Sequence, residues 1–111
     1  MTDTLALPYN KALAQLLADP RKSALIRALR KGELSFKVAK QHSGYEHNQS
    51  LSRALREFED LGLADHAFRH GSAEVYSFYD LTPFGKEVLV LLDSVERARH
   101  RRKSETVLVA P

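Results

Sequence analysis

The hydrophobic residues of this 111-residue chain change their period twice, and this change limits the folds that the chain can adopt. Over about the first sixty residues, apolar side chains recur at the three- and four-residue spacing of amphipathic helices. Segments 65–69 and 74–81 are instead rich in aromatic and β-branched residues, which is typical of a β-hairpin. Helical spacing returns at Pro83. The sequence therefore predicts a mainly α fold with a small β-hairpin, in the order helix, helix, helix, helix, hairpin, helix.

Most of the expected helices begin next to a residue that can cap them. Asp, Ser, Asn and Thr side chains accept hydrogen bonds at a helix start, Pro suits the first helical position, and Gly favours a helix end. These signals predict N-caps at Asp19, Ser35, Asn48 and Thr82, and helices over 9–18, 20–31, 36–42, 48–61 and 83–102. Residues 1–103 are expected to form a single domain that includes the dimerisation helices, and residues 104–111 a flexible C-terminal tail.

A short helix, a turn, a second helix and a two-stranded ribbon follow one another in the order of a winged helix-turn-helix domain. The second helix of such a domain enters the major groove of DNA, and its first turns contact base edges. The helix expected over 48–61 has an apolar stripe, and the opposite face is rich in Gln, Ser and Arg at its N-terminal end. The residues expected to contact DNA are Asn48, Gln49, Ser50, Ser52, Arg53 and Arg56. The alternative is a plain solvated face, because such residues are common on exposed helices.

Three segments carry a resemblance to a known group of proteins. The run Asn-Gln-Ser-Leu-Ser-Arg-Ala-Leu-Arg-Glu-Phe-Glu-Asp-Leu-Gly-Leu at 48–63 resembles the recognition-helix signature of winged-helix regulators of the ArsR, MarR and HxlR type. Segment 19–29 is similar to the second helix of ArsR-like proteins, and segment 79–85 is similar to the end of the wing in MarR-like and HxlR-like proteins. The resemblance implies a winged-helix fold that binds DNA.

The chain departs from that family pattern in two respects. Its connection over 41–47 is slightly longer, so the turn is enlarged or the recognition helix starts earlier. It also has no cysteine, and it therefore lacks the thiolates of the commonest ArsR-type metal sensors and the redox cysteine of many HxlR-like regulators.

The expected hairpin ends in the tip Arg69-His70-Gly71-Ser72. The wing of a winged-helix protein lies along an adjacent minor groove or the DNA backbone, where negative potential favours arginine. Arg69 and His70 are therefore expected to contact DNA. The alternative is a solvent-exposed hairpin whose arginine is incidental.

The last expected helix is apolar on more than one side. The face that its period assigns to the chain's own core consists of Phe84, Val88, Leu91 and Val95. Further apolar residues lie outside that face, and a helix that is apolar nearly all round is buried nearly all round. A homodimer is therefore expected, with half-sites about 34 Å apart and contacts from Leu13, Leu17, Leu89, Val90 and Leu92. The alternative is a monomer with a few exposed leucines.

Charge alone says little about the partners of this chain. The 17 Lys and Arg residues against 14 Asp and Glu residues give a net charge of +3, which permits nucleic-acid binding without arguing for it. Positive charge is concentrated in the segment Arg97–Lys103. This segment could contact the DNA backbone or an acidic partner, or it could be a solvated helix end, where cations suit the helix dipole.

The residues do not assemble into a recognisable catalytic or metal-binding motif. The chain has no cysteine, no Gly-rich phosphate loop and no metal-ligand spacing among its five histidines. We therefore expect no catalytic residue, no metal and no cofactor, and not an enzyme. There is no signal-peptide pattern, and the longest apolar run, 88–92, is far shorter than the roughly 20 residues of a membrane span. A cytoplasmic protein without a membrane partner is expected.

Together these features favour a sequence-specific, double-stranded DNA-binding transcriptional regulator, most simply a dimeric repressor. Two other functions remain open, namely a winged-helix module for protein assembly and a DNA-binding protein of replication, partition or chromosome organisation. A small-molecule effector is permitted, although no polar residue near the expected dimer helices indicates one.

Overall fold

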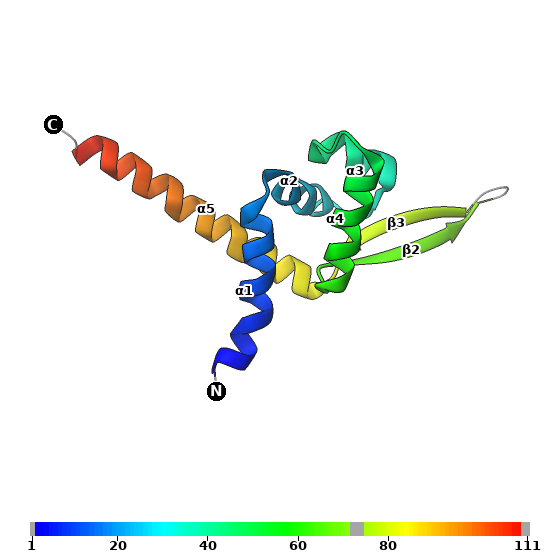
Figure 1. Ribbon diagram of the computed structural model, residues 1–111, viewed down its shortest axis with the longest axis horizontal. Helices are drawn as coiled ribbons and strands as arrows, with labels where there is room; N and C mark the ends of the chain where they lie inside the picture. The colour runs from blue at the N-terminus through cyan, green and yellow to red at the C-terminus, as the bar shows by residue number, and fades with distance from the viewer. Residues whose placement is uncertain (1, 72–74, 110–111) are drawn as a thin grey trace.

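The computed structural model describes the backbone of residues 2–71 and 75–109 and the side chains of residues 8–71 and 76–101. Within these ranges the elements are α1 (Thr2–Ala18), α2 (Pro20–Leu29), β1 (Leu34–Ser35), α3 (Phe36–Ser43), α4 (Asn48–Asp60), β2 (Ala64–His70), β3 (Val75–Leu81) and α5 (Pro83–Val109). Figure 1 shows α5 and the β2–β3 hairpin projecting on opposite sides of the group formed by α2, α3 and α4. The mainly helical fold with a small hairpin is confirmed. None of the described helices is long and apolar enough to cross a membrane.

Three of the expected N-caps are confirmed by their hydrogen bonds. The Asp19 carboxylate accepts the main-chain N–H of Arg21 at 2.9 Å, with Asp19 in an extended conformation. The Ser35 hydroxyl accepts the N–H of Val38 at 3.3 Å. The Thr82 hydroxyl accepts the N–H of Gly85 at 2.9 Å. Local side-chain chemistry therefore fixes where α2, α3 and α5 begin.

The expected N-cap of α4 is wrong by one residue. His47 is the extended cap residue and makes no side-chain capping bond, so Asn48 is the first residue of the helix. Packing of the preceding turn explains the difference. Gly44 ends α3 with a left-handed φ of 84°, and Tyr45 is buried beneath the Arg21 guanidinium, 4.6 Å from its ring centre. The buried Tyr45 sets the path of the chain into α4, and this overrides the preference of Asn for the cap.

A short strand, β1, was not expected from the sequence. It pairs antiparallel with β3, with Leu34 opposite Tyr79 and Ser35 opposite Phe78, so the sheet has three strands in the order β1-β3-β2. Two residues are too few to display the alternating pattern of a strand. The hairpin itself is confirmed, with Ala64 opposite Leu81 and His70 opposite Val75. Ser72, at the expected tip, lies outside the described residues.

Two helices extend beyond their expected ends. Helix α1 begins at Thr2 instead of Tyr9 and contains Pro8. Helix α5 continues to Val109 instead of ending near Arg102, so most of the segment expected as a flexible tail over 104–111 has helical backbone; its flexibility stays a prediction. The physical reason is that no Gly or Pro occurs between Lys86 and Val109, and nothing in that segment ends a helix.

The buried face of α5 is rotated from the expected one. Val88, Leu89 and Leu92 are at most 3% exposed and belong to the chain's own core, whereas Leu91 is 38% exposed. Leu89 and Leu92 were expected at a dimer interface, so this part of the expectation is corrected. The cause is that both α1 and α2 pack against α5, and a helical period alone cannot show which neighbours cover which side.

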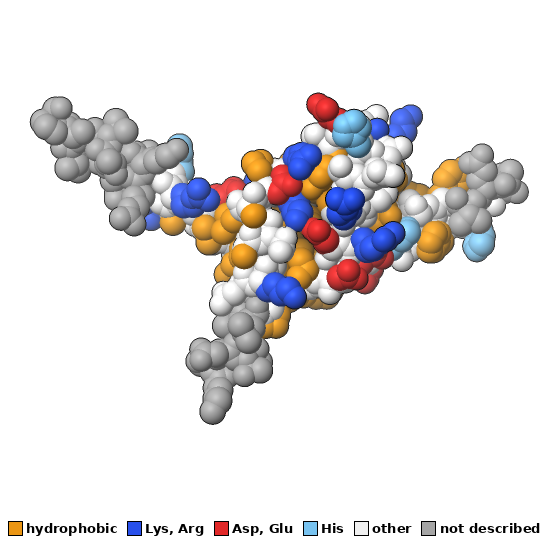
Figure 2. Space-filling view, in the orientation of Figure 1, with side chains coloured by type: hydrophobic (Ala, Val, Ile, Leu, Met, Phe, Trp, Pro, Cys, Tyr) orange, Lys and Arg blue, Asp and Glu red, His pale blue; other side chains and the backbone are white. Residues whose placement is uncertain are grey.

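The remaining residues expected at a dimer interface have different degrees of exposure. Val90 is 62% exposed on α5. Leu13 and Leu17 of α1 are partly buried and pack against the core. Figure 2 shows apolar side chains at the surface along α1 and the adjoining part of α5.

Candidate nucleic-acid interface

Helix α4 is oriented by its apolar stripe. Leu51, Ala54, Leu55 and Phe58 are at most 3% exposed and lie in the core. Because these residues recur every three or four positions, the polar residues between them must face outward. Gln49, Ser52, Arg53 and Arg56 are indeed exposed. The burial pattern expected for this helix is confirmed.

The exposed side chains of α4 form one concave surface, which we call the α4 pocket. It has a volume of about 400 Å³ and is lined by Asn48, Gln49, Ser52, Arg53 and Arg56. Ser50 is half-buried and is not among the lining residues. Guanidinium groups donate in a planar fork, and the Gln amide both donates and accepts. The surface can therefore form directed, paired hydrogen bonds with a partner that presents both donors and acceptors.

The two arginines of the α4 pocket differ from most of the arginines in the preceding helices. Among the described side chains, neither Arg53 nor Arg56 forms an ion pair with Asp or Glu. By contrast, Arg21 pairs with Asp19 at 3.2 Å, and Arg27 and Arg30 pair with acidic residues of α5. The first turn of α4 also carries no acidic residue. Positive charge and free N–H groups are thus available at the helix start, which suits an anion.

The face around α4 is not basic throughout. Glu59 and Asp60 are exposed near the C-terminal end of the helix. Figure 2 shows blue and red side chains interspersed over this side of the molecule. The part of α4 from Asn48 to Arg56 is therefore better suited to a polyanion than its acidic C-terminal end, as the distribution of its residues predicts.

The wing arginine already has a partner within the chain. The Arg69 guanidinium donates to the Glu33 carboxylate and lies over the Phe78 ring, 5.1 Å from its centre. The Glu33 carboxylate therefore partly neutralises Arg69 and competes with any other anion for its guanidinium. His70 is exposed at the end of β2.

A contact between α4 and the hairpin was not foreseen from the sequence. The Nδ1 atom of His66 lies 3.8 Å from a carboxylate oxygen of Glu59, and its ring stacks on Tyr79 with centres 4.3 Å apart and an angle of 10°. Burial raises the pKa of Tyr79, and the nearby Glu59 carboxylate raises it further. His66 thereby links the end of α4 to the base of the wing. The alternation of positions 64, 66 and 68 in a strand was the available signal, but it does not identify a partner on α4.

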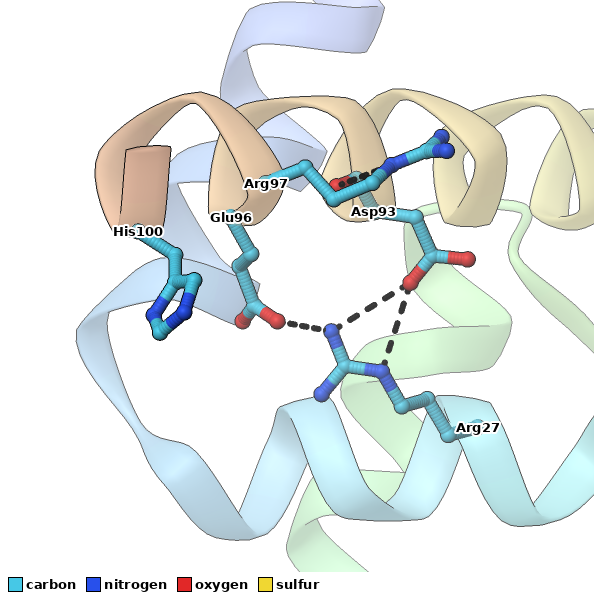
Figure 3. Close-up of a pocket in the computed structure, with 5 residues that line it drawn as sticks. All are labelled: Arg27, Asp93, Glu96, Arg97 and His100. Atoms are coloured by element: carbon cyan, nitrogen blue, oxygen red, sulfur yellow. Dashed lines mark hydrogen bonds and ion pairs between the residues drawn. The ribbon is translucent and has the colours of Figure 1, made fainter. Parts of the chain in front are cut away.

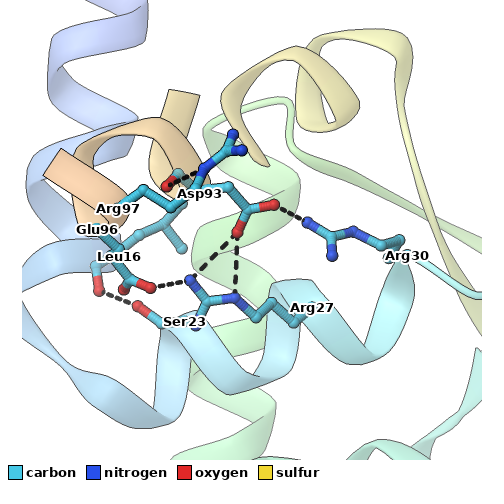
Figure 4. A network of polar contacts seen from close by, with 7 residues as sticks. All are labelled: Leu16, Ser23, Arg27, Arg30, Asp93, Glu96 and Arg97. Atoms are coloured by element: carbon cyan, nitrogen blue, oxygen red, sulfur yellow. Dashed lines mark hydrogen bonds and ion pairs between the residues drawn. The ribbon is translucent and has the colours of Figure 1, made fainter. Parts of the chain in front are cut away.

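Helices α2 and α5 are joined by a polar network that sequence reasoning also missed. Arg27 donates to Asp93 at 3.4 Å and to Glu96, and Arg30 donates to Asp93 (Figure 4). An open pocket of about 520 Å³ lies here, lined by Arg27, Asp93, Glu96, Arg97 and His100 (Figure 3). Part of the basic segment Arg97–Lys103 thus borders a structural junction. Arg99 and Arg101, which belong to this segment, are exposed and form no ion pair among the described residues.

Solved structures share this architecture. YodB from B. subtilis matches with a TM-score of 0.73 and 18% identity over 83% of this chain and 89% of that chain. A MarR family transcriptional regulator from Silicibacter pomeroyi DSS matches with a TM-score of 0.66 and 22% identity over 91% of this chain and 67% of that chain. Bacillus subtilis PadR in complex with operator DNA matches with a TM-score of 0.52 and 26% identity over 61% of this chain and 43% of that chain. No protein-family model and no curated protein matches the sequence. These similarities confirm the winged-helix fold.

Proposed function

We propose that this protein is a sequence-specific, double-stranded DNA-binding transcriptional regulator without enzymatic activity. The observation that carries the proposal is the α4 pocket, in which two arginines without ion-pair partners among the described residues adjoin Gln49 and Ser52 on the exposed start of the helix. The fold adds support, because the similar solved structures include transcriptional regulators and one complex with operator DNA.

The first turns of α4 enter the major groove in this proposal. Arg53 and Arg56 pair with guanine or contact phosphates, and Gln49 pairs with adenine, because these are the geometries that their side chains match. Ser52 and the first N–H groups of the helix bind phosphate oxygens. The wing extends beside the helix, where Arg69 and His70 contact the adjacent backbone or minor groove.

The regulator acts as a homodimer that represses by covering a promoter. Val90 and Leu91 leave apolar surface exposed on α5, and Leu13 and Leu17 of α1 are only partly covered. Pairing two copies through these helices removes that surface from water and presents two α4 helices to half-sites about 34 Å apart. No effector is included, because no described residue identifies one.

The proposal is tested by selecting binding sites from random duplex DNA with the purified full chain. We expect an enriched, two-fold symmetric site. We also expect the affinity for it to fall log-linearly with salt, by a slope of about −0.9 for each phosphate contacted. Absence of binding to any duplex at low salt would overturn the proposal and favour a protein-assembly module. Binding without sequence preference would favour a role in chromosome organisation.

A further inference from the structure

The outer half of strand β2 carries an aromatic ring that the chain itself does not cover. Phe68 is 63% exposed, the highest exposure of any large hydrophobic residue described. Its partner across the hairpin is Ser77, which is too small to shield a phenyl ring. Exposing a Phe side chain forgoes about 1.5–3 kcal/mol of burial free energy. A partner that covers this ring would recover that free energy.

The ring is held in place by a stack that begins in the core. Tyr79 is 8% exposed, His66 stacks on it at 4.3 Å, and Phe68 lies 4.6 Å from His66. His66 is also 3.8 Å from Glu59 of α4. Because alternate residues of a strand share a face, Phe68 lies on the hairpin face that adjoins α4. The stack therefore connects the exposed ring to the C-terminal part of α4, next to the surface that we propose binds DNA.

The two described strands place no acidic residue on the face of Phe68, and the Glu59 carboxylate of α4 adjoins only its base. The two acidic residues within the strands, Asp65 and Asp80, lie opposite each other on the other face. That face also holds Arg69 in its pair with Glu33. The face of Phe68 instead continues to His70, which can donate a hydrogen bond to phosphate.

We propose that Phe68 is an apolar wedge that enters the minor groove beside the α4 binding site and opens one base step. The inference rests on the proposed function and extends it to DNA deformation. Phe68 is four residues along β2 from the buried Ala64 at the start of that strand, a length of about 13 Å. This reach along the wing is comparable with half a turn of B-DNA, about 17 Å, which separates neighbouring grooves. Phe is one of the side chains that unstack base steps and bend DNA toward the major groove.

The wedge gives the protein a sequence preference that involves no hydrogen bond to a base. Pyrimidine–purine steps such as TA and CA are the most easily unstacked. We therefore expect the selected site to contain such a step outside the segment read by α4, at the position of the wing.

The test compares Phe68→Ala with Tyr76→Ala in the full chain on the selected duplex. Tyr76 is a matched control, because it is a 49% exposed aromatic residue on the opposite face of the same hairpin. DNA bending is measured by energy transfer between dyes at the duplex ends, and base unstacking by 2-aminopurine fluorescence at the flexible step. Phe68→Ala is expected to lose most of the bend, the fluorescence increase and the preference for the step, with five- to tenfold weaker binding. Tyr76→Ala and Phe68→Leu are expected to retain them.

The outcomes separate the wedge from the proposed function. If Phe68→Ala binds and bends DNA like the unchanged protein, the wedge is wrong and the regulator proposal stands. If Phe68→Ala instead changes the oligomeric state in sedimentation and leaves bending intact, the ring contacts a second copy and the wedge is again wrong. If the unchanged protein binds no duplex, the proposed function itself fails. Equal melting temperatures for both alanine variants establish that the comparison reports contacts and not unfolding.

Discussion

The guanidinium of Arg27 in α2 lies 3.4 Å from the carboxylate of Asp93 in α5, so an ion pair joins α2 to the last helix. Both side chains are about one-third exposed, at 34% and 29%. Arg27 also donates to Glu96, and Arg30 reaches the other oxygen of Asp93. Because α5 is the proposed dimer helix, this network links that helix through charges to α2, which packs against α3.

A double-mutant cycle with Arg27→Ala and Asp93→Ala is expected to give a coupling of about 0.5–1 kcal/mol in the free energy of unfolding. This is the upper part of the range for exposed ion pairs, because two guanidinium nitrogens share one half-buried carboxylate oxygen. The coupling should fall as salt is raised. Urea denaturation at two ionic strengths measures it. Arg97→Ala is the control, since Arg97 bonds a main-chain carbonyl, and it should change stability by less than about 0.5 kcal/mol.

Asp19 provides a prediction about pH. The hydrogen bond from the Arg21 side chain lowers the pKa of Asp19 below 3.8, and burial opposes this shift only in part. Since the folded pKa is below the unfolded one, the stabilisation is present above pH 4 and is lost as pH falls through the folded pKa. Asp19→Ala is expected to cost about 1 kcal/mol at pH 7 and clearly less at pH 3. Asp19→Asn retains a capping oxygen without the charge, so it should recover only the part of the loss that does not depend on pH. An equal cost of Asp19→Ala at both pH values would contradict this account.

Gly85 lies where α5 meets the loop after α4. A Cβ atom at this position would be 2.1 Å from the main-chain oxygen of Leu63, which already accepts the N–H of Thr82 at 3.0 Å. Helix propensity alone favours Ala over Gly by about 1 kcal/mol. The clash should outweigh this gain in helix propensity, so Gly85→Ala is expected to lower the free energy of unfolding by about 1–3 kcal/mol. Lys86→Ala, at the next and exposed position, is the control for propensity. A stabilised Gly85→Ala variant in urea denaturation would show that α5 does not approach Leu63 so closely.

The parts of the fold that the sequence predicts are those encoded within single elements. The caps at Asp19 and Ser35 depend on neighbouring residues, and the outward face of α4 depends on the period of its own apolar stripe. Gln49 and Arg53 could therefore be assigned to the candidate site without a structure. Their role in binding DNA remains a prediction.

The missed side-chain contacts join residues of different elements. The Glu33–Arg69 pair connects the start of β1 to the wing, and the His66–Glu59 contact connects β2 to α4. Neither contact can be predicted from the hydrophobic period of the sequence. The rotated face of α5 has the same origin, because burial of Leu89 depends on helices that pack from two sides.

The Glu33–Arg69 pair leads to a prediction about the wing. Glu33→Gln should release Arg69 and raise affinity for the selected duplex more than Asp80→Asn does. Both substitutions remove one negative charge, but among the described residues Asp80 forms no ion pair with an arginine. Arg69→Ala should reduce the slope of log affinity against log salt by about 1, the value for one phosphate contact. Fluorescence anisotropy over a salt series measures both effects. An unchanged slope would mean that Arg69 stays on Glu33 in the complex.

Arg53 should determine base preference. If its planar fork bonds guanine, Arg53→Ala is expected to weaken binding to the selected site by about 1–3 kcal/mol and to relax the preference at one base pair. Arg53→Lys keeps the charge but lacks the fork, so it should preserve the salt dependence while still losing the preference. Repeating the site selection with both variants tests the assignment. A motif that both variants select unchanged would exclude Arg53 from base readout, and a uniform loss of affinity across all duplexes would make it a phosphate contact instead.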